Sequence, residues 1–96
     1  MNRHNDKEIK DLVSSVIDAF NLRPKYMEYK VREFWTQEMS PLVTRHTANI
    51  TIKGAKLYIK INSASVKHDL FIQRTQLKEL INKALEQEFV DEVIFT

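Results

Sequence analysis

The side chains best suited to binding a ligand lie in a short alternating segment near the middle of the chain. Lys56, Tyr58 and Lys60 alternate with apolar residues, which places all three on one face of a β-strand. An aromatic ring among lysines on an open sheet can stack a nucleic-acid base while the ammonium groups contact phosphates. The alternative is an ordinary cross-strand contact between tyrosine and lysine in water.

Two more cations extend this surface. Lys53 precedes Gly54, the only glycine of the chain, and a tight turn there would bring Lys53 close to Lys56. Arg45 precedes the first strand of the same hairpin and is expected at its far end, near Lys60. The candidate nucleic-acid-binding residues are therefore Arg45, Lys53, Lys56, Tyr58 and Lys60, and the alternative is the helical surface around Lys67, Arg74 and Lys78.

The charge of the chain is unevenly distributed. The net charge is +2, but residues 20–78 hold 11 Lys or Arg against 4 Asp or Glu, whereas the last 18 residues hold one Lys against five acids. Such clustering is a weak indication of an anionic partner. A solvated basic face without any ligand is the alternative interpretation.

Other kinds of chemistry lack the residues that they need. The chain has no cysteine, and its three histidines, His4, His46 and His68, show no metal-binding spacing. One glycine is too few for a phosphate-cradling loop, and no serine lies on a glycine-flanked turn. We therefore expect no catalytic residue, no metal, no cofactor and no small-molecule substrate.

Length and hydropathy limit the architecture. The 96 residues predict one domain spanning residues 1–96, with residues 1–4 disordered. No apolar run exceeds three residues, which excludes a transmembrane helix and a signal peptide. The absence of cysteine fits a reducing compartment, so we expect a cytoplasmic protein without membrane contact.

A helix opens the chain. Apolar residues recur at helical spacing from Ile9 to Phe20 and form a single stripe. Asn5 and Glu8 form a capping-box pattern in front of it, and Asn21 suits the left-handed residue that ends a helix.

A second helix starts near Pro24, a residue that suits the first turn. Its apolar stripe includes Trp35, which we expect to anchor the core rather than to form an interface hot spot. Ser40 and Pro41 end or kink this helix, and Ser40 can cap a short continuation.

The hydrophobic period then changes from helical to alternating. Residues 49–53 and 56–61 predict a hairpin around Gly54, two helices follow with a break near residues 72–74, and residues 89–95 predict a last strand. A crossover of two helices makes the last strand parallel to the second. The predicted fold is α+β, with two layers in the order α-α-β-β-α-α-β and a three-stranded mixed sheet with helices on one face.

The chain resembles the DciA family of bacterial proteins, which is associated with the replicative helicase DnaB. Short segments carry the resemblance in the family's order: Phe20-Asn21-Leu22, Val31–Met39, Arg45-His46-Thr47, the strand Lys56–Ile61, Asn62–Ser65, Asp69-Leu70, Leu80-Ile81-Asn82 and Val93-Ile94-Phe95. Two features depart from the family: Ser40-Pro41 stands where a glycine is usual, and the flexible extension of longer members is missing.

The resemblance implies a fold similar to the type II KH domain and a role at DnaB, with DNA binding in some members. The segment Leu70–Thr75 lacks the GxxG of a true KH module, so nucleic acid should use another surface. The leading hypothesis is a non-catalytic replication accessory protein that binds DnaB and possibly DNA. The alternatives are a stand-alone KH-like module that binds nucleic acid, and a structural homo-oligomer formed through the sheet edge.

Overall fold

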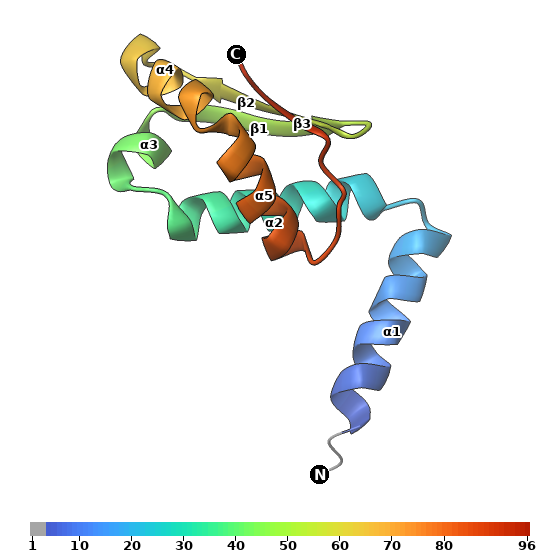
Figure 1. Ribbon diagram of the computed structural model, residues 1–96. Coiled ribbons are helices and arrows are strands. Elements are labelled where there is room, and N and C mark those ends of the chain that lie inside the picture. Colours follow the sequence, from blue (N-terminus) through green and yellow to red (C-terminus); the bar gives the residue numbers. More distant parts are fainter. Residues whose placement is uncertain (1–3) are drawn as a thin grey trace.

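The computed structural model describes residues 4–96 (Figure 1). Eight elements follow one another in the predicted order, and they are the helices α1 (His4–Ala19), α2 (Arg23–Glu38) and α3 (Pro41–Arg45), the strands β1 (Thr47–Lys53) and β2 (Lys56–Ile61), the helices α4 (Ala64–Ile72) and α5 (Arg74–Leu85), and the strand β3 (Glu92–Phe95). The α+β class and the order α-α-β-β-α-α-β are confirmed, with α3 as the short continuation of the second helix.

The three strands form one mixed sheet in the order β1-β2-β3. β1 and β2 are antiparallel neighbours joined by the predicted turn, where Gly54 has a φ of +64°. Positive φ is the conformation that glycine adopts without strain. β3 lies parallel to β2 after the crossover through α4 and α5, as predicted.

The core lies between the sheet and the helices α2 and α5, which cover one face of the sheet (Figure 1). Strand residues such as Leu57 and Ile59 are fully buried against helix residues such as Val31 and Ile81. Trp35 is 2% exposed, and its indole N–H donates a hydrogen bond to Thr47 Oγ1 at 2.9 Å. Its predicted role as a core anchor is therefore confirmed.

Local signals in the sequence account for most helix ends. Ser40 Oγ accepts a hydrogen bond from Val43 N–H at 3.4 Å, and Ser63 Oγ accepts one from Val66 N–H at 3.3 Å. Asn21 has a φ of 55°, the left-handed conformation expected after the first helix. The break between α4 and α5 falls at Gln73, within the predicted interval.

Two predicted boundaries are wrong. α1 begins at His4, so Asn5 lies within the helix rather than before it; residues 1–3, most of the segment predicted to be disordered, lie outside the described residues. β3 begins at Glu92, three residues later than predicted. The reason is Asn82, which is 3% exposed: its Oδ1 accepts from Val90 N–H at 2.9 Å and its Nδ2 donates to the Val90 carbonyl at 2.8 Å. These bonds hold Val90 against α5 instead of in the sheet.

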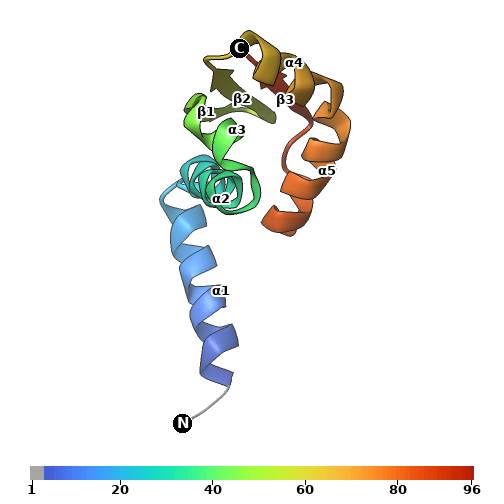
Figure 2. The same cartoon turned by 90° about the vertical axis from the view of Figure 1, so that its left-hand side faces the viewer.

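α1 does not join the helical layer. It extends away from the rest of the molecule and contacts it at its C-terminal end (Figure 2). Its apolar stripe forms as predicted, but Ile17 is the only buried residue of that stripe. The stripe is therefore a surface feature of this chain and not part of the main core.

Candidate nucleic-acid interface

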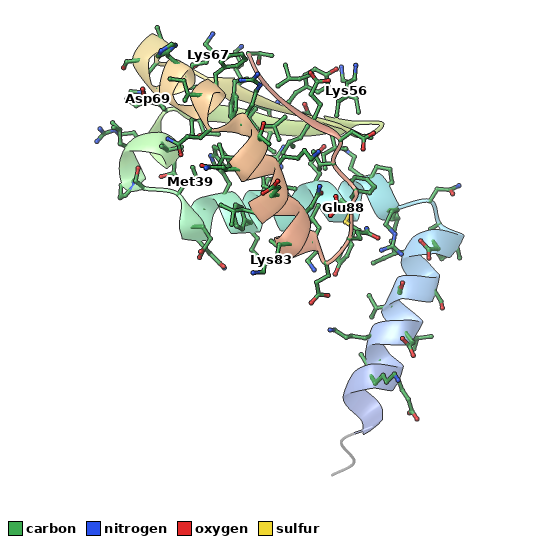
Figure 3. The ribbon with its side chains drawn as sticks, viewed as in Figure 1. Met39, Lys56, Lys67, Asp69, Lys83 and Glu88 are labelled. Atoms are coloured by element: carbon green, nitrogen blue, oxygen red, sulfur yellow. The ribbon has the colours of Figure 1, made fainter. Side chains whose placement is uncertain are left out.

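Four of the five predicted site residues lie on the open face of the sheet. We call Lys53, Lys56, Tyr58 and Lys60 the hairpin face. Their positions alternate with the buried residues of β1 and β2, so their side chains point away from α2 and α5. Figure 3 shows Lys56 on the opposite side of the molecule from Lys83, which belongs to α5. The structure thus brings these four residues together, as the sequence predicts.

Lys53 and Lys56 are direct cross-strand partners beside the turn, and both are exposed. Side chains in directly opposite positions have Cβ atoms about 5 Å apart, and like charges there destabilise a sheet. An anion that bridges the two ammonium groups would relieve this repulsion. A phosphate bound here would compete with the acids at the same end, Asp91 and Glu92.

Tyr58 occupies the centre of the hairpin face. Its neighbours in register are Thr51 on β1 and Ile94 on β3. The tyrosine is half-buried between them, which limits its motion while part of its surface remains accessible. A ring held in this way can stack against a base with little further loss of conformational freedom.

Arg45 is the one predicted site residue outside the strands, and it lies at the Lys60 end of the hairpin, where the carbonyl of the next residue, His46, accepts from Asn62 N–H at 2.8 Å. Arg45 is the last residue of α3, an exposed position at the end of the sheet near the start of β1. The bulge between Thr47 and Asn49 interrupts the regular register between α3 and the hairpin face. A nucleic acid bound at Tyr58 would therefore reach Arg45 only if it extended past the end of the sheet.

The third strand adds two residues that sequence reasoning missed. Glu92 is the partner of Lys56 and Ile94 is the partner of Tyr58 in the parallel register. The alternation of β3 could have placed both on the open face, but only its register with β2 shows which residues they meet. Asp91 also lies at this end, because its N–H donates to the Ala55 carbonyl in the turn at 2.7 Å. Acids therefore offset the lysines near the turn, whereas Lys60 is paired with neutral Asn49.

The free edge of β1 is blocked by side chains of α2. Glu28 Oε2 accepts a hydrogen bond from Ile52 N–H at 3.0 Å, and Arg32 donates to the Ile50 carbonyl. Asn49 Oδ1 accepts from Ile50 N–H at 2.9 Å. These groups are the ones that an added strand would need. The geometry therefore does not favour a homo-oligomer formed through this edge.

On the alternative helical surface, the three cations are either held by a neighbouring residue or half-exposed. Arg74 places its guanidinium 4.1 Å from the centre of the Phe71 ring and donates to the Phe71 carbonyl at 3.0 Å. Lys67 and Lys78 are only half-exposed. The arginine at the start of α5 is thus held against the last turn of α4, whereas the lysines of the hairpin face are exposed.

Among residues 7–96, whose side chains the structure describes, no group of three or more His, Cys, Asp or Glu could hold a metal ion. None of the helices in residues 4–96 has the length and apolar character needed to cross a membrane.

One family model matches the chain over residues 8–95, and its description is "Dna[CI] antecedent, DciA". No curated protein and no solved structure matches the chain.

Proposed function

The chain belongs to the DciA family, and from that membership we propose that it is an accessory protein of DNA replication that binds the replicative helicase DnaB. The observation that carries this proposal is the extent of the match, which covers residues 8–95 of 96. The matched range holds α2 to β3 in full and most of α1. The family role therefore concerns the whole folded unit, which we propose to be a single KH-like domain acting in the cytoplasm.

The proposed role is non-catalytic, and it consists of binding the helicase and assisting its loading. The chain carries 11 Lys or Arg between residues 20 and 78, and this basic excess would attract an anionic polymer such as DNA. The hairpin face supports a contact with DNA as a second activity. Lys53, Lys56 and Lys60 would contact phosphates and Tyr58 would stack against a base.

The experiment that tests the helicase proposal is retention of DnaB from the same organism on the immobilised chain after nuclease treatment. Nuclease removes DNA that could bridge two DNA-binding proteins. We expect DnaB to be retained by the native chain and lost with Ile59→Asp, which places a charge at a position that is 0% exposed. Failure of the native chain to retain DnaB would remove the proposal.

A second candidate function is a stand-alone nucleic-acid-binding module, and the alignment of four polar site residues on one open face supports it. The affinity for a single-stranded oligonucleotide separates the two candidates when it is measured over a range of salt. Phosphate contacts give a slope of roughly 0.7 in log K against log salt for each phosphate neutralised. Tight, salt-sensitive binding without any affinity for DnaB would favour this second candidate.

A further inference from the structure

The apolar face of α1 is the largest departure of this structure from an ordinary small domain. Five residues of its stripe are between 45% and 70% exposed, and these are Ile9, Leu12, Val13, Val16 and Phe20. An amphipathic helix ordinarily covers such a stripe with the rest of the protein. Among the α1 residues whose side chains the structure describes, only Ile17 is buried, and a helix with so little tertiary packing is marginally stable on its own. An exposed apolar stripe of this kind is typical of a surface that binds another protein chain.

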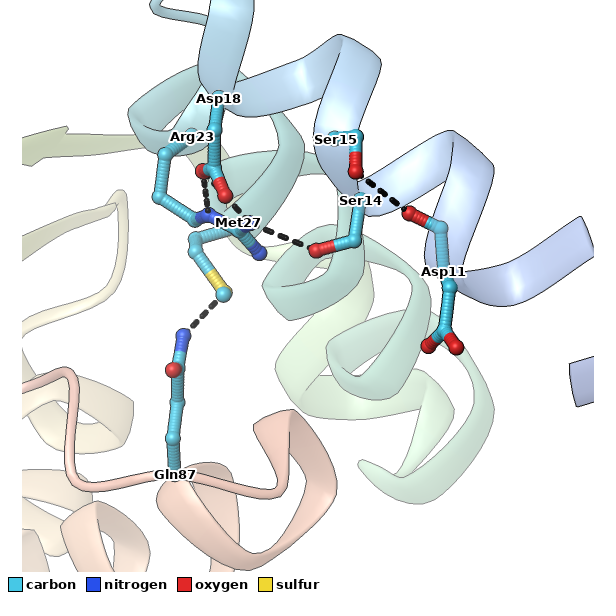
Figure 4. Close-up of polar contacts among 7 residues, drawn as sticks. All are labelled: Asp11, Ser14, Ser15, Asp18, Arg23, Met27 and Gln87. Carbon is cyan, nitrogen blue, oxygen red and sulfur yellow. Dashed lines mark hydrogen bonds and ion pairs between the residues drawn. The ribbon is translucent and has the colours of Figure 1, made fainter. Parts of the chain in front are cut away.

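The junction between α1 and α2 keeps α1 away from the body of its own molecule. Arg23 donates to Asp18 Oδ1 at 2.7 and 3.1 Å and to Ser14 Oγ at 3.1 Å (Figure 4). Asn21 turns the chain between the helices with its left-handed backbone. These contacts join α1 and α2 at an angle that leaves α1 away from the core of its own chain.

The same junction forms a groove between α1 and the body. The groove has a volume of about 510 Å³. Its apolar walls come from three helices, with Ile9, Val13 and Ile17 on α1, Tyr26 and Met27 on α2, and Leu85 on α5. A helix laid in this groove would touch α1 on one side and the body on the other.

The charges of the groove and of α1 are complementary. α1 holds four acids against two lysines, a net charge of −2. The wall that the body contributes holds Arg23 and Lys30 on α2 against Glu86 at the end of α5. Asp18 on α1 and Arg23 on α2 already form an ion pair of this kind within one chain. A negative helix is also poorly suited to an anionic membrane surface.

We propose that the α1 stripe and this groove are the interface with a second copy of the chain, in which each α1 lies in the groove of the other. The two surfaces that must fit are both present on one molecule, which is the requirement for a two-fold interface. The acidic α1 of one copy would meet the basic wall of the other.

The available apolar area is close to what a specific dimer needs. Covering the five exposed stripe residues on two copies would remove on the order of 1,000 Å² from water, close to the lower limit of about 1,200 Å² for specific interfaces. The walls contributed by α2 and α5 add to this area. The expected dimer is therefore of modest affinity and depends on concentration.

Sedimentation equilibrium between about 1 and 500 µM tests the proposal. We expect a mass that rises from monomer to dimer for the native chain, and a monomer for Leu12→Glu combined with Val16→Glu, whose dissociation constant should rise roughly a hundredfold or more. Both residues are exposed, so the fold of the monomer should remain intact. Leu80→Glu is the matched control, because Leu80 is 51% exposed on a different helix, and it should still dimerise.

Three results would overturn the proposal. They are a native chain that stays monomeric throughout, a double variant that still dimerises, and a Leu80→Glu control that becomes monomeric. If the native chain is monomeric and the double variant loses only DnaB binding, the helicase and not a second copy occupies α1. Because DnaB binding is measured separately, failure of the dimer proposal is distinguishable from failure of the helicase proposal.

Discussion

Glu92 lies directly beside Lys56 in the parallel register of β3 and β2. This neighbour makes the charge on the hairpin face uneven, because Lys60 is paired with a neutral residue instead. A phosphate that approaches Lys56 also meets the carboxylate of Glu92. A DNA contact at this surface would therefore depend on both signs of charge.

Glu92→Gln should therefore strengthen binding to a single-stranded oligonucleotide. Removing one negative charge about 5 Å from a lysine is worth up to about 1 kcal/mol in water, so we expect a gain of roughly two- to fivefold at low salt. Fluorescence anisotropy of a labelled oligonucleotide measures the effect. Glu88→Gln, an exposed acid on the loop before β3, is the control. An equal gain in the control would indicate a general charge effect rather than a site.

Neutralising Lys56 and Lys60 together, as Lys56→Gln with Lys60→Gln, should weaken the same binding and lower its salt dependence. Two phosphate contacts contribute roughly 1.4 to the slope of log K against log salt for a single strand. Both side chains are exposed, so the circular dichroism spectrum should not change.

Lys25→Gln with Lys83→Gln is the matched control for this double change, because it removes the same charge from exposed helix positions. If the Lys56 and Lys60 variant keeps its affinity and slope, the site lies elsewhere, and the surface around Lys67, Arg74 and Lys78 is the next candidate.

Tyr58→Ala should weaken single-strand binding more than duplex binding, because the bases of a duplex are already stacked. Stacking on an aromatic side chain is worth about 1–3 kcal/mol per base, which corresponds to a loss of roughly 5- to 150-fold. Tyr58→Phe keeps the ring and should retain most of the affinity. Equal losses for both nucleic acids would show that Tyr58 supports the sheet rather than a base.

The sequence predicts most of the fold because the signals that set it are local. The Gly54 turn, the serine caps at Ser40 and Ser63 and the change in hydrophobic period each involve residues close in the chain. The start of β3 could not be predicted in this way. It depends on Asn82, which bonds Val90 across eight positions after the chain has folded.

The candidate site could likewise be predicted only where a local pattern defines it. Alternation places Lys56, Tyr58 and Lys60 on one face without any structure. The neighbours on β3 and the side chains of α2 that block the β1 edge are long-range contacts, and no spacing within one segment reports them. The exposed stripe of α1 has the same cause, since a helical period shows that a helix is amphipathic but not what covers it.

Asn82→Ala should destabilise the fold by about 2–4 kcal/mol, since it leaves the buried N–H and C=O of Val90 without partners. Urea denaturation measures the free energy of unfolding. Asn62→Ala is the control, because Asn62 is exposed, and it should change stability by less than about 0.5 kcal/mol. A loss below about 1 kcal/mol for Asn82→Ala would contradict the role assigned to this residue.

A calorimetric titration of the native chain into DnaB from the same organism tests the helicase proposal most directly. We expect saturable binding with a dissociation constant in the micromolar range or tighter, about −8 kcal/mol or below. That binding should persist at a salt concentration that abolishes binding to the oligonucleotide. Absence of any binding at several hundred micromolar, with the chain shown to be folded, would contradict a role at the replicative helicase.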